Sequence, residues 1–61
     1  MEMIHRVNLA AGEALPRNLP MRACWWLETV GRVSSLEIWK IGSATKLSAV
    51  VGTREVGTYT I

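Results

Sequence analysis

The sequence predicts a small, mainly β protein, an antiparallel β-sandwich or barrel-like meander of about four to five strands with an irregular, proline-containing arm. Glycines at Gly12, Gly31, Gly42, Gly52 and Gly57 divide the chain into short segments. Two of the intervals between them fall in the range of about 8–12 residues that is typical of strands joined by turns. Several segments are also rich in β-branched and aromatic residues, which favour strands.

The first predicted strand covers residues 4–9, in which Val7 and Leu9 share a face. Residues 12–20 follow and contain two prolines, which exclude a regular element across this stretch. We therefore expect residues 12–20 to form an irregular loop, or an arm that lies along a neighbouring chain.

Residues 21–30 fit two patterns. As a helix, Ala23, Trp26, Leu27 and Val30 have the spacing i, i+3, i+4, i+7, with a proline before the segment and a glycine after it. As a strand, the segment has apolar groups on both faces, and its Cys, Trp, Thr and Val residues favour this state. The prediction is a strand, and the helix remains the alternative.

The rest of the chain predicts three more strands, separated by turns that contain glycine: 32–41, 46–51 and 54–61. A tight turn at residues 31–32 would join the first of these to residues 21–30. Gly57 indicates a bulge in the last strand. The strands at 4–9 and 54–61 are expected to be the open edges of the sheet, which pair readily with another chain.

Length and composition indicate a single domain, residues 1–61, that is only marginally stable alone. A chain this short buries about 60% of the surface that its unfolded form exposes. Cys24 is the only cysteine and His5 the only histidine, so neither a disulfide nor a four-ligand zinc site is available. Association is the remaining common route to stability, and a content of 49% hydrophobic residues with three tryptophans agrees with it.

The sequence carries no motif for catalysis or for a cofactor. His5 and Cys24 lie far apart in sequence, and a cysteine between Ala23 and Trp25 has the character of a small buried hydrophobe. The glycines form no phosphate-binding loop. No segment approaches the roughly 20 apolar residues of a membrane helix. We expect a non-enzymatic protein without catalytic, cofactor-binding or metal-binding residues and without a membrane partner.

Charge argues against nucleic acid as the main partner. The net charge is +2, and the basic residues are spread along the chain without a run. A small β-barrel that binds single-stranded nucleic acid nevertheless stays an alternative, since an aromatic platform beside basic groups is the usual device for this purpose. The side chains available for it are Trp25, Trp26, Trp39, Tyr59, Arg22, Arg32, Lys40 and Lys46.

Apolar residues on both faces of the predicted sheet indicate a partner protein. In a strand, Trp25 and Trp26 would point to opposite sides. The chain has too little mass to cover both faces of the sheet. If both faces stayed in contact with water, they would form an unusually large exposed apolar patch. The candidate interface residues are Trp25, Trp26, Trp39, Ile41, Tyr59 and Ile61.

Four runs of the chain resemble small β-rich virion-associated proteins of tailed bacteriophages: residues 7–12, 24–29, 36–43 and 55–59. In that family an aromatic-aromatic-Leu-Glu strand leads through a turn into a strand that ends in Gly-Ser, and a Gly-aromatic strand follows. The loop at residues 13–21 is longer and richer in proline than in the family.

The resemblance implies a minor component of the virion, such as a capsid decoration or cement protein or a tail-associated protein. Its partners would be the major capsid protein or another virion protein, together with copies of itself. The third alternative is a small subunit of a cellular protein complex, which would place the chain in the cytoplasm.

Overall fold

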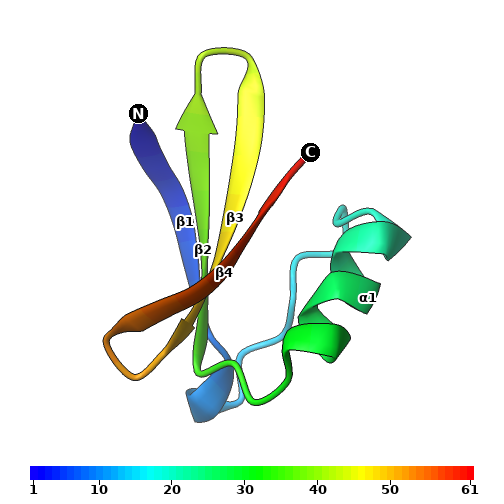
Figure 1. Cartoon of the computed structure of the whole chain (residues 1–61), viewed down its shortest axis with the longest axis vertical. Coiled ribbons are helices and arrows are strands. Elements are labelled where there is room, and N and C mark those ends of the chain that lie inside the picture. Colours follow the sequence, from blue (N-terminus) through cyan, green and yellow to red (C-terminus); the bar gives the residue numbers. More distant parts are fainter.

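The structure is a computed structural model that describes residues 1–61, and it consists of one four-stranded antiparallel sheet with one α-helix on one face (Figure 1). In chain order the elements are β1 (Glu2–Asn8), the 3₁₀ turn η1 (Leu9–Ala11), α1 (Met21–Val30), β2 (Ser35–Ile41), β3 (Ala44–Val51) and β4 (Arg54–Thr60). Strands hold 48% of the residues and helices 21%, which confirms a mainly β chain. Its second layer is the helix, and neither a second sheet nor a closed barrel forms.

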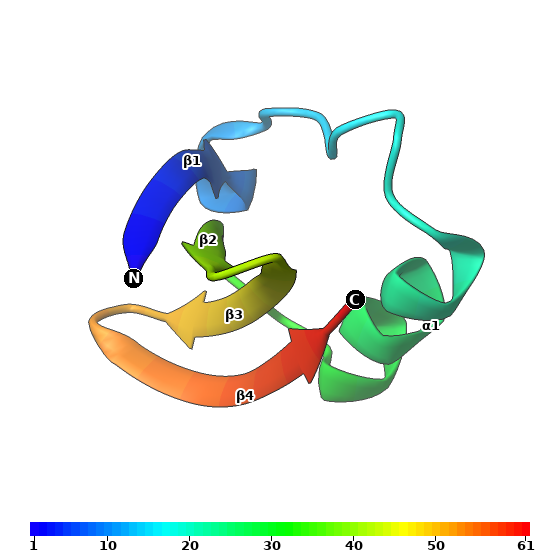
Figure 2. The ribbon, with the colours of Figure 1, turned by 90° about the horizontal axis from the view of Figure 1, so that it is seen from above.

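The strands follow one another in the sheet in the order β1-β2-β3-β4, and β1 and β4 are its edges, as predicted. Gly42 and Gly52 lie in the two tight turns that join β2 to β3 and β3 to β4, with φ of 59° and 66°. Left-handed backbone at these positions suits glycine and matches the twist of a hairpin. The sheet is strongly twisted, and Figure 2 shows β4 as its last strand, with α1 beside the C-terminal end of β4.

Residues 21–30 form the helix α1, so the prediction of a strand there is wrong. Ala23 and Leu27, one helical turn apart, are buried against the sheet, and Trp26 and Val30 pack beside them. The helical spacing therefore outweighs the strand preference of the Cys, Trp, Thr and Val residues. Pro20 stands immediately before the helix, where its missing N–H costs nothing.

The predicted hairpin at residues 31–32 is also wrong, because this segment ends a helix. The N–H of Gly31 donates to the carbonyl of Leu27 at 3.0 Å, and both Gly31 and Arg32 have positive φ. The strand begins at Ser35 instead of residue 32. The side chain of Ser34 fixes this corner, since its Oγ donates to the carbonyl of Val50 and accepts from the N–H of Gly52.

Residues 12–20 contain no strand or regular helix, and they cross from the end of β1 to the start of α1 (Figure 1). Leu19 packs against the core of the same chain. The segment is therefore a connecting loop whose last part is held by its own domain.

The core lies between α1 and the sheet face that it covers, which we call the inner face. Its buried apolar side chains come from every layer of the molecule: Val7, Ala23, Leu27, Leu36, Leu47 and Ala49. Only 9 of the 61 residues are buried. With so small a core, the position of one helix determines whether the domain has an interior at all.

Gly57 makes room for the helix on β4. A Cβ atom at this position would lie 3.5 Å from Cζ2 of Trp26 and 3.8 Å from Cγ2 of Val30. The Trp26 ring also lies against Tyr59, with the ring centroids 5.5 Å apart. The register shifts beside Gly57, where Val56 has no partner on β3, so the predicted bulge is present.

The close approach of Trp26 and Val30 to Gly57 predicts that the effect of a substitution on stability depends on the size of the new side chain. We expect Gly57→Ala to stabilise the fold by about 0.5 kcal/mol, because one methyl group fits and alanine restricts the unfolded chain. Gly57→Leu should destabilise it by about 2 kcal/mol, because the larger side chain displaces Trp26 and Val30. Urea unfolding of the two variants measures the difference. Equal stability of both would show that the helix does not press on this strand.

Candidate interaction surface

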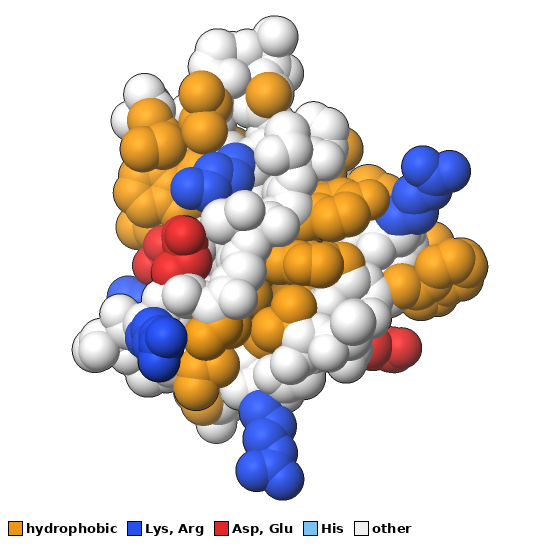
Figure 3. Space-filling view, in the orientation of Figure 1, with side chains coloured by type: hydrophobic (Ala, Val, Ile, Leu, Met, Phe, Trp, Pro, Cys, Tyr) orange, Lys and Arg blue, Asp and Glu red, His pale blue; other side chains and the backbone are white.

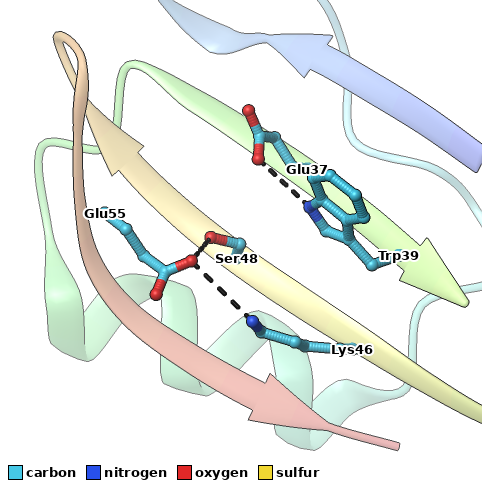
Figure 4. Close-up of polar contacts among 5 residues, drawn as sticks. All are labelled: Glu37, Trp39, Lys46, Ser48 and Glu55. Atoms are coloured by element: carbon cyan, nitrogen blue, oxygen red, sulfur yellow. Dashed lines mark hydrogen bonds and ion pairs between the residues drawn. The ribbon is translucent and has the colours of Figure 1, made fainter. Parts of the chain in front are cut away.

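The sheet face opposite α1, which we call the outer face, has no helix or second sheet over it. Alternation along the strands and the pairing register place these side chains on it: Met3, Arg6, Glu37, Trp39, Ile41, Lys46, Ser48, Glu55, Thr58 and Thr60. Figure 4 looks onto this face, with the helix behind the sheet. Met3, Trp39 and Ile41 contact solvent here, whereas Val50, Ser35 and Ser48 on the same face are buried.

Trp39 is the largest side chain on the outer face, and Glu37 holds its ring. The indole Nε1–H of Trp39 donates to Oε1 of Glu37 at 3.1 Å (Figure 4). The two residues are two positions apart on β2, so their side chains leave the same face of one strand. A hydrogen bond to a carboxylate reduces the rotamers open to the ring, so Glu37 fixes the orientation of Trp39.

Met3 and Ile41 extend the apolar area around Trp39. Met3 is directly opposite Trp39 on β1, and Ile41 is two residues further along β2. Their side chains are 44% and 42% exposed. Large apolar side chains exposed together, with polar groups around them, are typical of a protein-binding surface.

A second set of contacts crosses from β3 to β4. The hydroxyl of Ser48 donates to Oε2 of Glu55 at 2.5 Å, and Nζ of Lys46 lies 3.9 Å from the same oxygen (Figure 4). The ion pair is partly exposed, at 26% for Lys46 and 51% for Glu55, so it contributes at most about 1 kcal/mol. Arg6 is directly opposite Glu37 on β1, so charges of both signs alternate across the face.

Ser35 and Ser48 are both buried on the outer face, but their hydroxyl groups differ in hydrogen bonding. The Oγ of Ser35 has no hydrogen-bond partner, and Ser35 is 3% exposed. Ser48 is fully buried and has Glu55 as its acceptor. One buried hydroxyl is therefore satisfied and the other is not.

The six candidate interface residues from the sequence lie on four parts of the molecule. Trp39 and Ile41 lie on the outer face, while Trp26 and Tyr59 pack on the inner face against the core. Trp25 is on the solvent side of α1 at 60% exposure, and Ile61 follows β4 at 50% exposure. The expectation that Trp25 and Trp26 lie on opposite sides of a sheet is wrong, because both belong to the helix.

Sequence reasoning missed Met3 and Glu37. The shared face of Glu37 and Trp39 follows from their spacing on one strand and could have been found. The position of Met3 depends on the register shift between Met3 and His5, which no pattern in the sequence indicates.

The aromatic side chains do not form a single platform for nucleic-acid bases. Trp39 is on one side of the sheet, Trp26 and Tyr59 are on the other, and Trp25 points away from both. Lys46, one of the basic groups on the outer face, is close to Glu55. The arrangement differs from the continuous basic groove with stacked aromatics that is typical of single-strand binding.

Other chemistry-bearing groups lie apart from one another. His5 is exposed on β1 and Cys24 is half-buried in α1. No three His, Cys, Asp or Glu side chains come together as metal ligands, and the structure contains no pocket. The single α-helix is too short and too polar to cross a lipid bilayer.

Comparison with known proteins gives no relative: no family model, no curated protein and no solved structure matches the chain.

The two buried serines predict opposite effects of the same substitution. Ser35→Ala should stabilise the domain by about 1 kcal/mol, because it removes a buried hydroxyl without a partner. Ser48→Ala should destabilise it by about 1 kcal/mol, because it removes the donor to Glu55. Thermal unfolding of both variants tests this pair, and a loss of stability in Ser35→Ala would mean that its hydroxyl has a partner such as bound water.

Proposed function

We propose that this chain is a non-enzymatic assembly protein that binds other protein chains through the outer face of its sheet. The observation that carries the proposal is Trp39, a large aromatic side chain ordered by Glu37 on a sheet face that no helix or second sheet covers. Tryptophan in the centre of an interface contributes more binding energy than most residue types. An ordered ring also loses less conformational entropy when a partner covers it.

The surroundings of Trp39 support the proposal. Met3 and Ile41 supply further apolar surface, and Arg6, Lys46 and Glu55 supply charges of both signs around it. Figure 3 shows hydrophobic side chains gathered at the upper left of the sheet, directly beside a basic and an acidic side chain. An apolar centre with a polar rim is the usual composition of a specific protein interface.

The virion is the assembly that the resemblance favours, and we propose a minor virion component such as a decoration, cement or tail-associated protein. In this role the chain would bind the major capsid protein or another virion protein. The exposed first part of the loop at residues 12–20 would lie against the same neighbour, while Leu19 stays packed on its own domain. The proposal rests on the likeness of the four runs of sequence and on the outer face, and it involves no catalysis.

Purified particles test the virion assignment. Particles would be separated on a density gradient from cells that encode the chain, and the chain would be quantified in each fraction by mass spectrometry. Co-migration at a fixed ratio to the major capsid protein is expected. Recovery only with a cellular complex would favour the alternative of a small cellular subunit, and recovery only as free protein would contradict assembly.

Substitution of Trp39 tests the surface. We expect Trp39→Ala to weaken association with the particle or complex by at least about 2 kcal/mol, because the apolar centre of the interface is lost. Met21→Ala is the matched control, since Met21 is an exposed apolar residue on α1 at 67% exposure, away from the outer face. Co-sedimentation of each variant at a series of concentrations measures the affinity. Equal affinity of Trp39→Ala and wild type would refute the outer face as the binding surface.

A further inference from the structure

We propose that a second copy of this chain adds to the outer edge of β4 in antiparallel orientation, with the two-fold axis of the dimer at Tyr59. The inference rests on the proposed function in one respect, that the chain acts by binding protein. It concerns a different part of the molecule, since it uses the backbone of an edge strand and leaves the outer face free.

The backbone groups on the outer edge of β4 can be identified from the register. The N–H of Ile61 donates to the carbonyl of Thr45 on β3 at 2.8 Å. Tyr59, two residues before Ile61, is opposite Leu47, and Gly57, four residues before Ile61, is opposite Ala49. In an antiparallel pair, alternate residues point their N–H and C=O groups toward the neighbouring strand. Residues 57, 59 and 61 therefore bond to β3, and the N–H and C=O groups of Thr58 and Thr60 point away from the sheet.

The other edge of the sheet is already occupied in part. At the end of β1, the N–H of Asn8 donates to Oε1 of Glu13 at 2.8 Å, and the N–H of Glu13 donates to the carbonyl of Asn8 at 3.2 Å. The register shift between Met3 and His5 interrupts the opposite end of this strand. The charged side chain of Arg6 lies between the register shift and Asn8, which is bonded to Glu13. A bulge, a covering loop and charge are the usual devices that prevent an edge strand from pairing.

Of these devices the last part of β4 has only a bulge, at Val56, and this lies before the residues Thr58 and Thr60 whose backbone groups point outward. Residues 56–61 contain no charged residue and no proline, and four of the six are β-branched. Loop bonds and side-chain hydrogen bonds of the chain involve neither Thr58 nor Thr60. In Figure 2 no other strand lies beyond β4, and the last turn of α1 is beside its C-terminal end. An uncharged, β-branched edge with free backbone groups is a template for strand addition.

The segment is complementary to a second copy of itself. With the axis at Tyr59, Thr58 of one copy faces Thr60 of the other, and the two such pairs form four backbone hydrogen bonds that use only the outward-pointing groups. On the outer face these pairs place threonine beside threonine, which is a favourable cross-strand combination. The two Tyr59 side chains become neighbours on the inner face, where each already lies against Trp26 of its own chain.

The same register brings Ile61 of each copy opposite Gly57 of the other. Gly57 has no side chain, and the edge of the Trp26 ring is 3.5 Å from where its Cβ would be. Ile61 is 50% exposed and lies on the same face. Its side chain can therefore cover the backbone at Gly57 and contact the Trp26 ring of the second copy, which adds apolar burial to the backbone bonds.

A two-fold axis perpendicular to the sheet keeps both helices on one side. The dimer would have one continuous eight-stranded sheet, and its two outer faces would form a single surface with two copies of Trp39. Two linked sites bind a repetitive partner more tightly than one site does. Pairing at β4 thus strengthens the binding proposed for the outer face without contributing a residue to it.

Thr58→Pro is the variant that separates this edge from the rest of the fold. Proline removes the N–H of Thr58, which no residue of the same chain uses, and edge positions of this kind tolerate proline. Arg6→Pro is the matched control, because alternation with Asn8 also points the N–H of Arg6 outward, on the edge strand β1. The mass of each protein would be measured by sedimentation equilibrium from micromolar to millimolar concentration, with circular dichroism as the check of folding.

We expect the wild type and Arg6→Pro to dimerise and Thr58→Pro to raise the dissociation constant at least about tenfold. Amide hydrogen exchange gives a second readout on the unmodified chain. The amides of Thr58 and Thr60 should exchange freely at low concentration and become protected as the dimer forms. If Thr58→Pro does not fold, a synthetic chain with a methyl group on the Thr58 amide nitrogen replaces it.

Three results would overturn the pairing at β4: a wild type that is monomeric at every concentration, a dimer that Thr58→Pro leaves intact, or amides of Thr58 and Thr60 that stay unprotected in the dimer. A monomer that still binds particles through Trp39 would refute the pairing and leave the proposed function standing. A dimer that binds no particle or complex would refute the proposed function and leave the pairing at β4 standing.

Discussion

The packing of α1 on the inner face of the sheet is the interaction on which the rest of this structure depends. The six residues of the core come from both layers, and the chain contains no disulfide or second core that could replace them. Ala23 and Leu27 enter this core from the helix, and Gly57 lets Trp26 approach β4. Because one helix can cover only one face, the same packing that stabilises the domain leaves the outer face and the edge of β4 open.

This division of the sheet separates structural side chains from those available for binding. Trp26 and Tyr59 stabilise the chain itself, whereas Trp39 lies on the open side and is held by Glu37. The stability of a domain with 9 buried residues of 61 is small, and a partner that covers the outer face would add to it by mass action. In the proposed role, neighbouring chains of the assembly would supply part of the stability of this domain.

The parts of the fold that depend on local pattern could be predicted from the sequence, and those that depend on tertiary packing could not. The two glycine turns placed β3 and β4 nearly correctly, and both edge strands were identified. Residues 21–30 were missed because Trp, Cys, Thr and Val suit a pleated surface, while the burial of Ala23 and Leu27 together is decided only when the sheet is present. Pro20 and Gly31, which flank the helix on its two sides, are the sequence signal that indicates it. For the candidate surface, Trp39 and Ile41 were found, whereas Met3 and the role of Glu37 require the register.

On the proposed function, the outer face becomes buried in the assembled state and the solvent side of α1 stays exposed. Hydroxyl-radical footprinting read by mass spectrometry tests it directly, because methionine and tryptophan are oxidised where solvent reaches them and the chain carries both kinds of residue on each surface. The chain would be oxidised free in solution and in the particle or complex from which it is purified. We expect Met3 and Trp39 to become protected on assembly while Met21 and Trp25 keep their reactivity. Equal oxidation of Trp39 in both states, or protection confined to Met21 and Trp25, would contradict the account.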